Sequence, residues 1–437
     1  MTSRQAGLMI AAPHSGSGKT VITLALLRVL ADRGLDIRAA KAGPDYIDPA
    51  FHEIACGHAS VNLDPWAMAP ARMHALAEGQ GGTHLLVEAM MGLFDGAADG
   101  TAAGSGSAAD LAQELGLPVV LVVDAGKQSH SVAALARGFR DHRPNVAIAG
   151  VILNRVGSAR HEAMLRDALG AVGMHVFGAV PRSNALELPA RHLGLVQASE
   201  QVGMAQFVEQ AARAVGKSVA PDAITQAFAP VSPTNGKAGR LPPIGQRIAI
   251  ASDAAFSFTY PHLLADWRAA GADLSFFSPL QDEAPHEHTD AVFLPGGYPE
   301  LHGGRLSASA RFLDGLRAAA DRGALLYGEC GGYMVLGEGI EDADGARHAM
   351  AGLLKLETSF LQRRLQLGYR RLEAQRDFVL GNSLTGHEFH YSTALEEAGD
   401  PLFGVCNAAG AELGMTGLRA GKVMGSYIHV IDRQAGQ

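Results

Sequence analysis

AAPHSGSGKT, residues 11–20, joins an apolar run at 8–12 to a helical pattern at 20–33. The stretch ends in Gly-Lys-Thr, as a phosphate-binding loop does. The usual pattern, G-x-x-x-x-G-K-[ST], has a glycine where this chain has Pro13. Most of the backbone N–H donors of such a loop lie after that position. We therefore predict a variant phosphate-binding loop between a strand and a helix.

The apolar runs of the first half are uniformly apolar, which is typical of strands buried on both faces of a parallel sheet. They lie at 8–12, 37–40, 85–87, 119–123, 148–153 and 176–180. Helical stretches such as 20–33 and 131–140 separate them. Strand and helix in alternation predict an α/β fold with a doubly wound parallel sheet.

A segment rich in Pro, Gly, Ser and Ala interrupts this pattern near residues 216–245. Further apolar runs follow it at 247–251, 274–277, 291–294, 324–327 and 423–427. We therefore predict two α/β domains, at 1–215 and 246–437, that are joined by a linker.

The composition indicates an ordinary soluble protein. Of its 437 residues 47% are hydrophobic and 18% charged, and the net charge of −8 argues against a nucleic-acid partner. The apolar runs are far shorter than the ~20 residues of a membrane helix, and the first residues lack the apolar core of a signal peptide. Three scattered cysteines predict neither a disulfide framework nor a zinc cluster, so we expect a reducing, cytoplasmic setting.

The loop predicts a nucleotide site with bound Mg²⁺. Lys19 would reach the β- and γ-phosphates and Thr20 would bind the ion. The nucleotide-binding residues that we expect in the loop are Ser15, Gly16, Ser17, Gly18, Lys19 and Thr20.

Acidic residues follow several predicted strands, where ligands collect in open α/β sheets. They are Asp45, Asp48, Glu88 and Asp95, and Lys41 also stands at a strand end. The alternative for any one of these acids is a helix cap or a turn. Four more residues follow strands and could contact phosphate or base, or act as caps: Asp124, Lys127, Asn154 and Arg155.

A second site is predicted around Cys330. The segment 328–332, Gly-Glu-Cys-Gly-Gly, has the form of a nucleophile elbow between a strand and a helix. A helix N-terminus would lower the pKa of the thiol. His429, after another apolar stretch, is the expected base. The backbone N–H groups expected to form the oxyanion hole belong to Gly296, Gly297 and Gly331.

Other candidate groups are interpreted as structural. Cys56 and Cys406 lack the surroundings of a nucleophile. GHEFHYS places its histidines, His387 and His390, three residues apart rather than four as in a zinc protease, so we predict no zinc site there. The acidic segment QDEAPHEHTD, with His286 and His288, is expected to be a solvated loop.

Taken in order, seven motifs resemble those of the cobyrinic and hydrogenobyrinic acid a,c-diamide synthases of cobalamin biosynthesis, and the hydrogenobyrinic form more closely. They are APHSGSGKT, KAGPDYIDPAFH, VEAMMGLFDG, LPGGYPELH, YGECGGYMVLG, GHEFHYS and GSYIHV, and they span nearly the whole chain.

The resemblance implies a dethiobiotin synthetase-like N-terminal half and a class I glutamine amidotransferase, flavodoxin-like, C-terminal half. ATP and Mg²⁺ would activate the a and c acetate carboxylates of a corrinoid as acyl phosphates, and ammonia from L-glutamine would displace the phosphate. Cys330 and His429 would release this ammonia, which we expect to pass between the domains. The resemblance places four residues around the magnesium, ATP and acyl phosphate: Asp45, Asp48, Glu88 and Asp95. We also expect Lys41 and Asn154 in the ATP site and Tyr46 in the acyl-phosphate and substrate site.

Two departures from the family stand out. Ile431 occupies the place, two residues after His429, where class I amidotransferases carry a glutamate, so the third member of the triad is absent or comes from elsewhere. Ala89 and Met90 follow Glu88, where the family has a glycine-containing loop.

Several alternatives remain at the level of sequence. The corrinoid could carry cobalt, as cobyrinic acid does. The chain could act on another tetrapyrrole, such as a nickel sirohydrochlorin. It could also be a partitioning-type ATPase with an inert second domain, although its loop lacks the early lysine of that class. The cations expected to bind corrinoid carboxylates, with an exposed basic surface as the alternative, are Arg363, Arg364, Arg370 and Arg371. The oligomeric state stays open, with a homodimer among the options.

Overall fold

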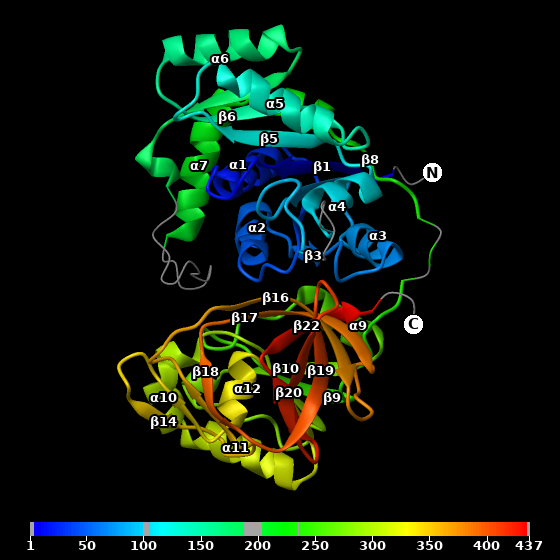
Figure 1. The fold of residues 1–437 in the computed structure, drawn as a ribbon, viewed down its shortest axis with the longest axis vertical. Helices are drawn as coiled ribbons and strands as arrows, with labels where there is room; N and C mark the ends of the chain where they lie inside the picture. Colours follow the sequence, from blue (N-terminus) through cyan, green and yellow to red (C-terminus); the bar gives the residue numbers. More distant parts are fainter. Residues whose placement is uncertain (1–3, 99–104, 188–202, 235, 237, 435–437) are drawn as a thin grey trace. The chain divides into compact units, whose positions relative to one another are not determined.

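The computed structural model of the chain describes residues 4–98, 105–187, 203–234, 236 and 238–434. They form two compact units, and the division between the units falls between Ala238 and Gly239 (Figure 1). The first unit contains a mainly parallel sheet, and the second contains a sheet that is parallel in one half and antiparallel in the other. Both units also carry helices, which confirms the predicted α/β class with two α/β domains. No helix of the described segments is long and apolar enough to cross a bilayer.

The first unit is built on a sheet in the order β3-β2-β4-β1-β5-β6-β7. These strands run parallel, and β8 pairs antiparallel with β1. The bounds of the strands are β1 Ala6–Ala11, β2 Ile37–Ala42, β3 Val61–Leu63, β4 His84–Glu88, β5 Val119–Asp124, β6 Ile148–Val156, β7 Val176–Pro181 and β8 Ala229–Pro230. Because the strands are parallel, the loops after them gather at one edge of the sheet.

Helices cover this sheet, and the apolar strands beneath them are fully buried. α1 packs against α2 and α7, and α5 packs against α6, as Figure 1 shows. The bounds of the helices are α1 Lys19–Asp32, α2 Asp48–Cys56, α3 Pro70–Gly79, α4 Ala108–Leu115, α5 Ser131–His142, α6 Ala159–Ala171, α7 Met204–Ser218 and α8 Pro221–Gln226, with a 3₁₀ turn η1 at Asn184–Leu186. Part of the segment expected to be a linker therefore belongs to this unit, because α8 and β8 lie within 216–245 and β8 extends the sheet.

The second unit combines a parallel half-sheet with an antiparallel one. Its long sheet has the order β10-β9-β11-β12-β21-β20-β19-β16-β17-β22, and β10 to β21 in this order are parallel. A smaller sheet has the order β14-β13-β15-β18. The bounds are β9 Arg247–Ala251, β10 Asp273–Phe277, β11 Ala291–Leu294, β12 Leu325–Glu329, β13 Gly339–Glu341, β14 Arg347–Ala349, β15 Leu356–Ser359, β16 Gln366–Ala374, β17 Ser383–His390, β18 Thr393–Glu397, β19 Asp400–Asn407, β20 Glu412–Ala420, β21 Val423–Ser426 and β22 Ile428–Arg433.

The helices of this unit are α9 Pro261–Ala269, α10 Gly303–Ala308, α11 Ala310–Asp321 and α12 Gly331–Leu336, with 3₁₀ turns η4 Pro279–Gln281 and η5 Pro299–His302. The strand predicted at 423–427 corresponds to β21, and a second strand, β22, follows it and contains His429. β22 pairs with β17, which sets His429 opposite His387. The carboxyl end of β12, next to Cys330, contacts this antiparallel half, because the backbone N–H of Val430 in β22 donates to Glu329.

Candidate active sites

The loop between β1 and α1 has the backbone of a phosphate-binding loop. Gly16 and Gly18 have φ values of 81° and 87°, in the left-handed region that favours glycine. A Cβ atom on Gly18 would lie 2.2 Å from the Asn154 amide nitrogen. That nitrogen donates to the carbonyl of Ser17 over 2.9 Å, so Asn154 stabilises the conformation of the loop. The Ser17 hydroxyl is buried and donates to the carbonyl of His14, so this side chain is held within the loop.

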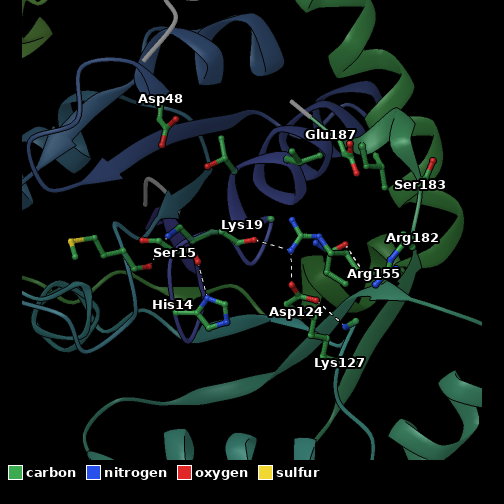
Figure 2. Close-up of a pocket in the computed structure, with 18 of the residues that line it drawn as sticks. His14, Ser15, Lys19, Asp48, Asp124, Lys127, Arg155, Arg182, Ser183 and Glu187 are labelled. Carbon is green, nitrogen blue, oxygen red and sulfur yellow. Dashed lines mark hydrogen bonds and ion pairs between the residues drawn. The ribbon is translucent and has the colours of Figure 1, made fainter. Parts of the chain in front are cut away.

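The loop opens on a cavity of about 1150 Å³. Five of the six predicted loop residues line it: Ser15, Gly16, Gly18, Lys19 and Thr20. The predicted residues Lys41, Asp45, Asp48 and Asn154 also line it, together with Asp124, Lys127 and Arg155. In Figure 2 Ser15 and Lys19 lie on one side of the cavity, and Arg182, Ser183 and Glu187 lie on the other.

The sequence interpretation missed Arg182, Ser183 and Glu187, which follow β7 and line the far wall. The rule that found the other candidates, polar residues after a buried strand, applies to β7 as well and could have found them. Arg155 donates to the carbonyl of Gly16 and pairs with Asp124. It therefore connects the loop to the end of β5.

Near Lys19 lies a cluster of buried charged side chains, which includes Lys41, Asp48 and Glu88. Lys41 Nζ is 2.5 Å from Asp48 Oδ2 and 3.1 Å from Glu88 Oε1. His52 Nε2 lies 2.8 Å from the other oxygen of Glu88, and Thr20 donates its hydroxyl proton to Glu88 over 2.8 Å. Burial alone would raise the pKa of Glu88, but Lys41 and His52 outweigh it and hold this pKa well below its usual range. Glu88 is therefore a buried anion beside the phosphate loop.

The pKa values of the two lysines of the site are shifted in opposite directions. Burial, followed by the positive charge of Lys41, lowers the pKa of Lys19 to about 8. In Lys41 burial is outweighed by Asp48 and Glu88, so its pKa is raised and the side chain stays charged. Burial and then the nearby Asp45 raise the pKa of Asp48 to about 6. Lys19 Nζ donates to the carbonyl of Met91, at the mouth of the cavity.

Three predicted residues of this unit have structural contacts. Asp45 Oδ1 accepts from the backbone N–H groups of Ile47 and Asp48, so it caps the start of α2 while it lines the cavity. Asp95 is exposed and accepts from the backbone N–H of Gly92 within its turn. Tyr46 is half-buried beside Asp45, and neither Tyr46 nor Asp95 is among the residues that line the cavity.

The second site is a nucleophile elbow at Cys330, between β12 and α12. Cys330 has φ 47° and ψ −107°, a strained conformation for a residue with a side chain. A Cβ on Gly332 would lie 1.9 Å from the carbonyl oxygen of Leu294, and one on Gly328 would lie 2.7 Å from the carbonyl carbon of Gly332. The flanking glycines are therefore required for the sharp turn, as in hydrolase elbows.

Cys330, His429 and the predicted oxyanion residues meet at this elbow. A Cβ on Gly296 would lie 2.2 Å from His429 Cε1 and 3.2 Å from Cys330 Cβ, so one small volume borders all three residues. A Cβ on Gly331 would lie 3.2 Å from the backbone nitrogen of Gly297. Gly331, which directly follows Cys330, thus packs against the backbone nitrogen of Gly297.

The expected lowering of the thiol pKa is wrong. Cys330 is only 3% exposed, and burial raises its pKa far above the ordinary value, with a further contribution from the negative charge of Glu300. The backbone N–H of Gly331 opposes the shift without reversing it. Burial, followed by His387 and His390, lowers the pKa of His429 to about 3. The free enzyme therefore holds a neutral thiol beside a neutral imidazole.

An acid that the sequence interpretation did not consider lies beside His429. Glu329 precedes Cys330, and its Oε2 is 3.7 Å from His429 Nδ1. Both side chains are almost completely buried. The two residues are a hundred positions apart in the chain, so no local spacing could have revealed the pair.

The remaining candidates, which are the predicted corrinoid-binding arginines and the histidines and cysteines interpreted as structural, differ in how far their side chains are exposed to solvent. Arg370 is buried and its Nε donates to Glu388 over 2.7 Å, so this arginine, one of the expected corrinoid cations, already serves an internal ion pair. His390 contacts the other oxygen of Glu388 at 3.0 Å. Arg371 is half-buried, whereas Arg363 and Arg364 are exposed. His286 and His288 are exposed on their loop, and Cys56 and Cys406 are free thiols in α2 and β19.

Comparison with known proteins identifies both halves. The model of the CobQ/CobB/MinD/ParA nucleotide-binding domain matches residues 8–196, and that of the CobB/CobQ-like glutamine amidotransferase domain matches residues 247–435. The second match is inconsistent with an inert C-terminal domain.

Three similar proteins are each named hydrogenobyrinate a,c-diamide synthase. One from a Sinorhizobium species is 56% identical over 98% of both chains. One from Rhizobium meliloti is 55% identical over 98% of this chain and 99% of its own. One from Rhodobacter capsulatus is 52% identical over 99% of this chain and its own full length. The chain belongs to the family of hydrogenobyrinate a,c-diamide synthases.

Proposed function

We propose that this chain is an ATP-dependent, glutamine-hydrolysing ligase that amidates the a and c acetate carboxylates of hydrogenobyrinate. The observation that carries the proposal is the presence of both a phosphate-loop cavity and a Cys–His elbow in one chain that is similar to such synthases over almost its whole length.

The nucleotide unit would activate the carboxylate. Ser15, Gly16, Gly18, Lys19 and Thr20 line the cavity, and backbone N–H groups of such a loop would bind the phosphates of ATP. A carboxylate oxygen of the substrate attacks the γ-phosphorus, ADP leaves, and an acyl phosphate forms. Lys19 neutralises charge on the transferred group. The buried charges around Lys41 hold Asp48 and Glu88 in place beside this reaction.

Magnesium fits the oxygen donors of this site. Thr20 and Glu88 lie within hydrogen-bond distance of each other next to the loop, and Asp45 lines the same cavity. Hard oxygen donors of this kind are the ligands that Mg²⁺ takes in nucleotide sites. We propose that Thr20 and Glu88, with Asp45, hold the ion, which would neutralise phosphate charge when bound.

The amidotransferase unit would supply ammonia. His429 takes the proton of the Cys330 thiol as the sulfur attacks the amide carbon of glutamine. The resulting oxyanion would meet the backbone N–H groups of Gly297 and Gly331, and the contact of Gly331 with the backbone nitrogen of Gly297 supports this assignment. Ammonia leaves with the proton from His429, and water then hydrolyses the thioester to glutamate. Ammonia attacks the acyl phosphate and phosphate leaves, which completes the amide.

The corrinoid bears several carboxylates and therefore requires cations. Arg363 and Arg364 are the exposed arginines of the predicted set, and we propose that they contact these carboxylates. The cobalt-free substrate is favoured over cobyrinic acid because it is the one named for the similar proteins. A reducing, cytoplasmic setting is part of the proposal, since all three cysteines are free thiols.

The test is an amidation assay with hydrogenobyrinate and, in parallel, its cobalt-bearing counterpart. Mass spectrometry would follow the diamide with either glutamine or ammonium chloride as nitrogen source. Cys330→Ala should abolish only the glutamine-driven reaction, and Lys19→Ala should abolish both. Cys406→Ala is the matched cysteine control. Wild-type protein that makes no diamide from either corrinoid with either nitrogen source would refute the proposal.

A further inference from the structure

Glu329 lies beside His429 although the family's usual acid position holds Ile431. We propose that Glu329 is the positioning residue for His429 and replaces the acid that triad amidotransferases carry two residues after the histidine. This inference rests on the proposed function, because it concerns how His429 acts as the base on Cys330.

The position of Ile431 offers no acid and no space for one. Its side chain is fully buried, and its backbone carbonyl accepts from His262 Nε2 over 2.8 Å. On the other side of His429, at the end of β12, Glu329 Oε2 faces Nδ1 at 3.7 Å. The carboxylate therefore reaches the same ring nitrogen that an acid in a triad would contact.

Glu329 is itself held in a fixed orientation. Its Oε1 accepts from the hydroxyl of Tyr327 over 2.9 Å and from the backbone N–H of Val430 over 3.1 Å. Val430 directly follows His429, so one carboxylate binds the strand that carries the base. Since Oε1 takes both of these bonds, Oε2 is the oxygen that faces the imidazole.

This arrangement sets the tautomer of His429. To take the proton of the thiol, the imidazole needs Nε2 free and its proton on Nδ1. A carboxylate that faces Nδ1 favours this form and stabilises the imidazolium that follows. The distance of 3.7 Å exceeds a hydrogen bond, and such contacts in free enzymes often shorten when the substrate binds. Burial of both groups strengthens the interaction.

The deciding variant is Glu329→Gln. Glutamine keeps the size of the side chain and can accept the bonds from Tyr327 and Val430 through its oxygen. Its amide then presents an N–H donor to Nδ1, which favours the wrong tautomer of His429. We expect kcat for glutamine hydrolysis to fall on the order of 10²–10⁴-fold, with KM for glutamine little changed. In ¹⁵N spectra recorded at about pH 9, where the carboxyl of Glu329 is ionised, the proton of His429 should move from Nδ1 in the wild type to Nε2 in the variant.

Two controls separate positioning from folding. Ammonia-driven amidation by Glu329→Gln should equal that of the wild type. Glu397→Gln should leave the glutaminase unchanged, although Glu397 also accepts from a tyrosine hydroxyl and a backbone N–H, those of Tyr333 and Gly417. Tyr327→Phe should lower kcat by a smaller factor because it removes one of the bonds that orient Glu329.

The inference is overturned if Glu329→Gln keeps kcat within about twofold of the wild type, or if its ammonia-driven activity falls in parallel. The second result would indicate a merely structural role. In either case the wild-type glutaminase and amidation activities, measured in the same experiment, would still support the proposed function.

Discussion

The hydroxyl of Thr20 donates to Glu88 Oε1 over 2.8 Å, and this bond joins the start of α1 to the end of β4. It sets the hydroxyl of a residue in the first turn of α1 beside a buried carboxylate. His52 and Lys41 contact the same carboxylate. Glu88 is thus held by three side chains, which would reduce the reorganisation needed for the proposed binding of Mg²⁺.

Glu88→Gln should weaken the binding of Mg²⁺ to the ligase, so that a higher Mg²⁺ concentration is needed for activity. Glutamine retains the shape and the bond from Thr20 but lacks the negative charge that attracts the ion. We expect the Mg²⁺ concentration for half-maximal ammonia-driven amidation to rise by roughly tenfold or more. Glu114→Gln is the control, because Glu114 also faces a histidine, His74, at 3.1 Å. An unchanged Mg²⁺ requirement in Glu88→Gln would exclude Glu88 as a ligand.

Lys41 should be essential for the stability of the first unit. It is a buried cation between Asp48 and Glu88, and Lys41→Met would leave two carboxylates without their counter-charge. Such removal costs about 3–5 kcal/mol. Urea unfolding, followed by a probe in this unit, would measure the loss. The double variant Lys41→Met/Asp48→Asn should recover part of it, and strictly additive losses would mean that the two side chains are not coupled.

The pH dependence of the glutaminase should follow Glu329 rather than His429. His429 has a pKa of about 3 and stays neutral throughout the working range. Burial raises the pKa of Glu329 to about 8, against the bonds from Val430 and Tyr327. The carboxylate therefore ionises as the pH rises through this value, and kcat/KM should rise between about pH 6.5 and pH 9.

Several groups surround this pair and bear on the same measurement. Tyr327 and Cys330 neighbour Glu329 along β12 and the elbow, while His387 and His390 approach His429 from β17. Glu329→Gln should have no alkaline rise at all, because the titrating group is gone. A rise centred near pH 6.5 in the wild type would instead indicate an ordinary histidine and contradict the role of Glu329.

The sequence was sufficient to predict those features of the sites that depend on consecutive residues. The loop at 15–20 and the elbow at 328–332 each carry their glycines, their functional side chain and the adjoining strand in one short segment. The charge state of Cys330 could not be predicted in this way, because it depends on burial and on Glu300. The contact of Glu329 with His429 depends on how β12 and β22 meet in the sheet. No single sequence motif predicts the strand order of the antiparallel half of the second unit, so this contact could not be predicted.

Gly296 should tolerate no side chain, because it borders both members of the catalytic pair. A Cβ at this position would lie 2.2 Å from His429 Cε1 and 2.9 Å from Nε2, closer than atoms can approach, so the imidazole would have to move. Gly296→Ala should therefore reduce glutamine hydrolysis by about 10²-fold or more, since the base would lose its alignment with the thiol. Ammonia-driven amidation should be retained. Gly304→Ala is the control, because a Cβ there meets its nearest neighbour, His348, at 3.7 Å, an ordinary contact. A fully active Gly296→Ala glutaminase would show that His429 can act from another position and that this arrangement of base and nucleophile is not the working one.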